Sequence, residues 1–536
     1  MRKIKKLFMR RSKVWTSNSN TPLLGNNNEL MSDAYDHDVN VCDTTFSSFN
    51  IQEERPAQRK DKITLQQLTE LLEVEPDAIS SNADQTNKGL VQKSVRRHLP
   101  KPPADLDQNL QQHLLDLQNT VLSELVRLSP RLEPEGLMGC VIECYHRQTW
   151  EHLHFLLQNV SSCKSYFALL FWGLKTYLSR DMLNNPVIEK LDAIKIVDVL
   201  HITAWESKAT EKLLESVQKN VRESLVNILR IERDKGTCDT DEDYVQLYVD
   251  IISCIHAMDS SAKQISSKLS KQVQEVCFQE LLTNVHRYHT EQTAVLKKIA
   301  KADEPGTIHF FKTLKMCKEL KKYVKDSGSG NSLCGEIGNM LQNMETFTLK
   351  LLMDVVADIA KRHLKTYFTT ANKHFSLPDA MKKHFPNLPN RQDVQKTVMD
   401  KAYKVIVGVY VDHLINTNRS KLRTCWRCEV GPRVVQDAEL LHCTVSELAP
   451  GVQPWNLKLV KIAEVLECNS NDGLKITIAV MQKESFTKSE DPNFLYKLLQ
   501  WKGLSKRDIT EVLDAIPPDC QPRTTSGTYC LCLPCL

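Results

Sequence analysis

Residues 106–130 read LDQNLQQHLLDLQNTVLSELVRLSP, and their apolar side chains recur every three or four positions. Six residues form this series: Leu110, Leu114, Leu117, Val121, Leu125 and Leu128. Spacing of this kind places the apolar side chains on one face of an α-helix of about five turns. We expect the helix to stop at Pro130, because proline lacks the amide hydrogen that a helix interior needs.

The same periodicity continues along the chain. It predicts helices at 135–158, 162–179, 187–205, 206–233, 242–258, 260–301, 306–325, 333–376, 392–417, 433–446, 455–468, 472–484, 492–501 and 505–514. Leu474 to Val480 alternates most like a strand, but we still favour a helix there. Only 17 of 536 residues are glycine, which argues against many tight turns. We predict an all-α chain whose long helices form an elongated rod of consecutive bundles.

The first fifteen residues combine cations with apolar side chains. Seven are basic (Arg2, Lys3, Lys5, Lys6, Arg10, Arg11 and Lys13), and the first acidic residue is Glu29. At helical spacing Ile4, Leu7 and Phe8 share a face, to which Trp15 returns. Such a segment suits an anionic membrane surface, where each cation contributes about 1 kcal/mol. The alternatives are a disordered basic tail, a nuclear-localisation or RNA-binding patch, and a mitochondrial presequence.

The basic character is confined to this segment. The formal net charge is +4, so the rest of the chain carries −3 once the seven cations are removed. A nucleic-acid-binding body is therefore a weak alternative. The chain has no apolar run of eighteen residues, the length that a membrane span needs, and no secretory signal, so its 17 cysteines suit a reducing, cytoplasmic compartment.

Composition divides the chain into four segments. Residues 1–15 form the basic amphipathic segment, and 16–105 read as a largely disordered linker with a short helix near 63–73. Residues 106–517 form the folded helical body, and 518–536 a flexible, cysteine-rich tail.

Several stretches of the body resemble the exocyst Sec-six family, the exocyst component three-like proteins. They are LMGCVIECYHR at 137–147, LLFWGLKTY at 169–177, YKVIVGVYVDHLI at 403–415, and the segments starting at Leu457 and Leu498. The resemblance spans about 106–515 and is strongest to the M-Sec-like, tumour necrosis factor alpha-induced members. It implies the bundle rod of multisubunit tethering complexes.

The resemblance also implies a function. Family members tether vesicles in exocytosis, dock them at the plasma membrane, and bind SNARE proteins or exocyst subunits. M-Sec-like members instead bind a Ral-type small GTPase and phosphoinositides to promote actin-rich protrusions. The segment Arg2 to Lys13 matches their basic element by position. The long coiled-coil arm of a full exocyst subunit is reduced here, which leaves membership of an exocyst complex open.

Two further sites are candidates for contacts outside the chain. Arg419, Lys421, Arg423 and Arg427 form a basic patch for an acidic GTPase or phosphoinositide face, unless they lie in a solvated loop. In the tail, Cys530, Cys532 and Cys535 are candidates for palmitoylation. Prenylation is disfavoured because Leu533 occupies the position where that signal needs cysteine.

No catalytic signature is present, neither a phosphate loop nor a nucleophile elbow nor a zinc-protease motif. Cys425 and Cys428 form a lone C-x-x-C that we interpret as structural thiols. The pairs His152/His154 and His286/His289 lack a third ligand at suitable spacing. We therefore expect no enzyme activity, no cofactor and no metal, and a soluble scaffold recruited peripherally to the plasma membrane.

Overall fold

The structure is a computed structural model of residues 1–536. It describes residues 65–72, 83–179, 198–234, 241–327, 332–369, 374–385, 392–426, 429–484, 491 and 493–515. Every regular element within these ranges is a helix, so the predicted all-α class of consecutive helical bundles is confirmed. In the described residues, no helix combines the length and the apolar character that crossing a bilayer requires.

The chain folds as two compact units. The first contains residues 1–216 and 260–270, and the second contains 217–259 and 271–536. The helices of the first unit are α2 (Leu65–Leu71), α3 (Ala83–His98), α4 (Leu106–Leu132), α5 (Met138–Asn159), α6 (Cys163–Phe171) and the π-helix η2 (Trp172–Tyr177). Three helices contribute residues to both units: α9 (Val199–Asp234), α10 (Asp241–Ile265) and α11 (Ser267–Ala300).

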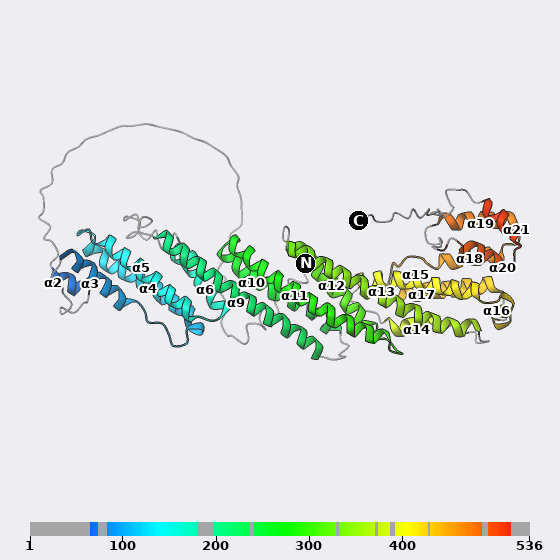
Figure 1. The fold of residues 1–536 in the computed structure, drawn as a ribbon, viewed down its shortest axis with the longest axis horizontal. Helices are drawn as coiled ribbons and strands as arrows, with labels where there is room; N and C mark the ends of the chain where they lie inside the picture. The colour runs from blue at the N-terminus through cyan, green and yellow to red at the C-terminus, as the bar shows by residue number, and fades with distance from the viewer. Residues whose placement is uncertain are drawn as a thin grey trace, which may run out of the picture. The chain divides into compact units, whose positions relative to one another are not determined.

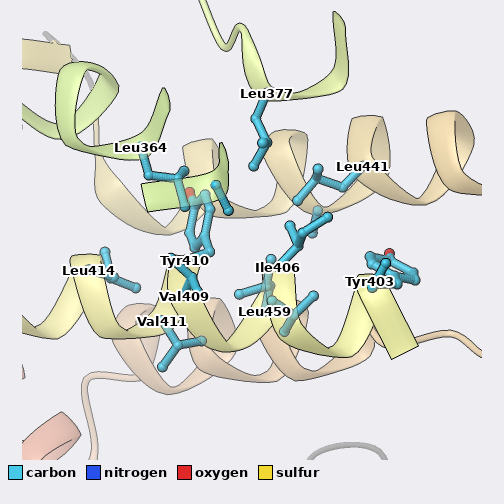
Figure 2. Close-up of a cluster of buried hydrophobic side chains, with 14 of the residues drawn as sticks. Leu364, Leu377, Tyr403, Ile406, Val409, Tyr410, Val411, Leu414, Leu441 and Leu459 are labelled. Atoms are coloured by element: carbon cyan, nitrogen blue, oxygen red, sulfur yellow. The ribbon is translucent and has the colours of Figure 1, made fainter. Parts of the chain in front are cut away.

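The second unit holds the remaining helices, which form its core together. They are α12 (Ile308–Ser327), α13 (Ser332–Thr369), α14 (Leu377–His384), α15 (Gln392–Asn416), α16 (Arg419–Trp426), α17 (Val430–Leu448), α18 (Leu457–Glu467), α19 (Asn471–Lys483), α20 (Phe494–Lys502) and α21 (Lys506–Asp514). The strand-like stretch at Leu474 is thus helical, as predicted. Figure 2 shows Ile406 and Tyr410 of α15 among Leu364, Leu377, Leu441 and Leu459, which come from four other helices.

The predicted apolar stripe of α4 is buried along its whole length, and α4 packs against α5 (Figure 1). The helix does not stop at Pro130, contrary to the prediction, but continues to Leu132. Leu128 and Leu132 are both buried on the same stripe. Their packing outweighs the hydrogen bond that the proline removes, since tertiary context overrides local propensity.

Residues 83–98, which fall in the expected linker, form α3. Leu90, Val91 and Val95 are buried, and α3 packs against α5. The Ser94 hydroxyl donates a hydrogen bond of 2.8 Å to the Leu72 carbonyl, which ties α3 to α2. Three apolar residues in a polar sequence are enough for a helix when a neighbouring helix covers them.

Helix boundaries also differ from the prediction elsewhere. The predicted break near residue 205 is absent, because α9 runs continuously from Val199 to Asp234. The predicted helix 260–301 is divided at Ser266, where the hydroxyl accepts a hydrogen bond of 3.1 Å from the Leu269 amide and caps α11.

Candidate functional site

The predicted basic patch lies on α16, a short helix of the second unit. Its Leu422 and Trp426 are buried in the core, which turns Lys421 and Arg423, on either side of Leu422, toward solvent. The Asn418 side chain accepts a hydrogen bond of 3.1 Å from the Lys421 amide and so caps the helix start. Amphipathic packing therefore fixes which cations of the patch face outward.

Arg419 of the patch has a structural role. Its Nη1 donates to the Lys502 carbonyl at 2.7 Å, and the Lys502 Nζ donates to the Leu466 carbonyl at 2.7 Å. Trp501 Nε1 donates to the Thr417 carbonyl at 2.5 Å. These carbonyls belong to the ends of α20, α18 and α15, where cations and N–H donors offset the negative helix ends. Burial, and then the Arg419 charge, lower the pKa of Lys502.

Arg423 is held by an internal carboxylate. Its Nε lies 3.1 Å from Glu429 Oε2 and its Nη2 lies 2.5 Å from Oε1, a two-point contact. The hydrogen bond to Glu429, and then the charge of Glu429, raise the pKa of Arg423. The fourth predicted member, Arg427, lies outside the described residues. The structure thus leaves Lys421 and Arg423 as the described, solvent-facing cations of the patch.

The other predicted membrane contacts are outside the described residues. These are the segment with Arg2, Lys3, Lys5, Lys6, Leu7, Phe8, Arg10, Arg11, Lys13 and Trp15, and the tail cysteines Cys530, Cys532 and Cys535. Their roles stay predictions. In the part of the chain that the structure describes, no three histidine, cysteine or acidic side chains are grouped as metal ligands.

The two motif segments at 137–147 and 169–177 meet in an aromatic cluster of the first unit. His146 Nδ1 lies 3.3 Å from the Tyr177 hydroxyl, and the Trp150 ring meets those of Tyr177 and Trp205 edge-on. Burial lowers the pKa of His146 to about 4. The cluster surrounds η2, and its edge-to-face rings explain the motif residues as packing residues.

A histidine pair joins α4 to α5. His113 Nε2 and His152 Nε2 are 2.8 Å apart, which requires that one nitrogen donates and the other accepts. Burial lowers the pKa of both imidazoles, that of His152 to about 4. The sequence singled out His152 but gave no signal for its partner 39 residues away.

Sequence reasoning also missed a buried polar network in the second unit. Asp437 on α17 is 2% exposed, and its Oδ2 accepts from the hydroxyls of Tyr367 at 2.8 Å and Tyr410 at 2.7 Å. Arg433 Nε lies 3.4 Å from Asp437 Oδ1 and donates to the Tyr367 hydroxyl at 2.7 Å. Burial nevertheless raises the pKa of Asp437 to about 6. This network fixes α13, α15 and α17 to one another.

Comparison with known proteins supports the fold alone. No family model and no curated protein matches the chain. Among solved structures, the helical bundles match the crystal structure of M-Sec with a TM-score of 0.54. The match covers 85% of this chain and 83% of M-Sec, at 15% sequence identity. This chain therefore shares the fold of M-Sec, and the fold that the sequence resemblance implied is confirmed.

Proposed function

We propose that this chain is a non-enzymatic tethering scaffold that is recruited peripherally to the cytoplasmic face of the plasma membrane. It would act in exocytosis and vesicle docking by binding SNARE proteins or exocyst subunits. The proposal rests on two observations together. The fold matches that of M-Sec, and residues 2–13 contain seven lysines or arginines, with no acidic residue before Glu29.

The recruitment is electrostatic. Cations near an anionic leaflet contribute about 1 kcal/mol each, and shallow insertion of apolar side chains such as Phe8 adds to this. Replacing Lys3, Lys5, Lys6, Arg10 and Arg11 by alanine, here called the five-alanine variant, removes five of the seven charges. The expected result is loss of sedimentation with phosphoinositide-containing vesicles.

A second candidate function is an exocyst-independent scaffold that binds a Ral-type small GTPase and phosphoinositides to promote actin-rich protrusions. Two observations favour it: the matching solved fold is that of M-Sec, and α16 presents Lys421 and Arg423 to solvent. Affinity capture of the intact chain distinguishes the two candidates. Exocyst subunits or SNARE proteins in the eluate support the first, and a GTPase without exocyst subunits supports the second.

A further inference from the structure

Glu429 precedes α17 but is bonded to the neighbouring helix α16. It is the N-cap of α17, yet its side chain makes no capping hydrogen bond to that helix. It accepts hydrogen bonds instead from Nε and Nη2 of Arg423 on α16. The side chains of Arg423 and Glu429 are 47% and 57% exposed, so the contact is open to exchange with groups in solution.

The exposed face of α16 favours a phosphate ligand. Its solvent-facing residues are Ser420, Lys421, Arg423 and Thr424, which offer hydroxyls and cations but no large apolar side chain. Protein interfaces take most of their energy from buried aromatic or aliphatic anchors. The guanidinium fork of Arg423 matches phosphate oxygens as well as it matches a carboxylate.

From this geometry we infer that α16 is a second contact for anionic lipid headgroups, and that Glu429 occupies it as an internal substitute for the lipid phosphate. A headgroup phosphate displaces the Glu429 carboxylate from Arg423, while Lys421, two residues earlier and so on another side of α16, stays outside that contact. Arg419 takes no part, because it is bonded to the end of α20. The inference rests on the proposed recruitment to an anionic membrane. It adds a second membrane contact, in which Glu429 competes with the lipid phosphate for Arg423.

Glu429 weakens the binding of a lipid phosphate to Arg423 but does not abolish it. An exposed ion pair contributes little to stability, so its exchange for a lipid phosphate costs little. Replacing Glu429 by glutamine keeps the shape of the side chain and removes its charge, which leaves Glu467 as the other carboxylate whose charge acts on Arg423. One freed cation near an anionic surface corresponds to about a fivefold gain in vesicle binding.

The test uses the intact chain in the five-alanine background, so that the N-terminal contribution is removed. The probe is phosphatidylcholine vesicles with and without a few per cent of phosphatidylinositol bisphosphate. Glu429→Gln is expected to raise sedimentation with the phosphoinositide vesicles about fivefold. Adding Arg423→Gln is expected to abolish that gain. Glu447→Gln is the matched control, because it removes the same charge from the pair with Lys382 at the other end of α17.

Three results overturn the inference: no gain from Glu429→Gln, a gain that survives Arg423→Gln, or an equal gain on phosphatidylcholine alone. The N-terminal anchor is judged separately, by comparing the unmodified chain with the five-alanine variant. If that variant still binds fully, the anchor is contradicted. The competition between Glu429 and the lipid phosphate for Arg423 is then tested in that variant: Glu429→Gln should raise the remaining vesicle binding, and Arg423→Gln should lower it.

Discussion

Asp437→Asn tests the buried network of the second unit. Asparagine offers one carbonyl oxygen to the hydroxyls of Tyr367 and Tyr410, which both donate to the same carboxylate oxygen in the structure. The substitution therefore keeps the two short hydrogen bonds, removes the charge, and places an amide N–H₂ group toward Arg433 in place of Oδ1. What changes is the dependence of stability on pH.

The sign follows from the direction of the pKa shift. Burial raises the pKa of Asp437 from 3.8 to about 6, so between these values the folded chain holds a proton that the unfolded chain has released. Asp437 therefore lowers the free energy of unfolding as pH rises through this window. Between pH 7 and pH 5 its contribution changes by about 1.4 kcal/mol, and stability is higher at pH 5. The asparagine variant lacks this change.

Hydrogen exchange of peptides from α13, α15 and α17, corrected for intrinsic rates, reports the opening free energy at each pH. Other groups titrate in this range too: burial lowers the pKa of His363 and of His384. Their effects cancel in the difference between variant and parent. That difference should change by about 1.4 kcal/mol from pH 7 to pH 5. A pH-independent difference for Asp437→Asn would refute the reasoning.

Three further substitutions test the packing. Gly173→Ala places a methyl group 3.1 Å from the buried Trp205 ring. It should destabilise the aromatic cluster of α5, η2 and α9 by about 1–3 kcal/mol, measured by hydrogen exchange. Gly139→Ala is the control and should not destabilise the cluster, because its methyl group meets open space. Leu441→Ala removes a fully buried side chain and should cost about 2–5 kcal/mol in denaturant unfolding, against less than about 0.5 kcal/mol for Leu440→Ala, where the leucine is 47% exposed. Arg222→Ala takes the two-point partner from Glu280, which is 4% exposed, and should lower the unfolding midpoint; an unchanged midpoint would contradict that contact.

The regular part of the fold could be predicted from apolar periodicity. The series from Leu110 to Leu128 is buried as expected, and α19 is helical although its sequence alternates. Periodicity works here because each helix buries one stripe, and a stripe is a local property of the sequence.

The remaining features depend on distant partners. α3 is stable because α5 covers Leu90 and Val95, and α4 passes Pro130 because Leu132 is buried. Asp437 reads as one more polar residue until Tyr367 and Tyr410 converge on it from other helices. No local pattern records such contacts.

The candidate site could be predicted only by composition. A count of cations placed Arg419 with Lys421 and Arg423. The structure separates them, because Arg419 is bonded to the end of α20 and Arg423 is paired with Glu429. Lys502 lies 83 residues after Arg419, so no local pattern links the two, whereas Glu429 follows Arg423 by only six residues but lies outside the regular helix spacings of three or four.

Vesicle binding across a salt series tests the central claim most directly. We predict that the intact chain sediments with phosphoinositide vesicles, that binding weakens steadily as salt rises, and that the five-alanine variant stays in the supernatant at about 0.15 M salt. Equal sedimentation of the chain and the five-alanine variant at that salt would contradict the account.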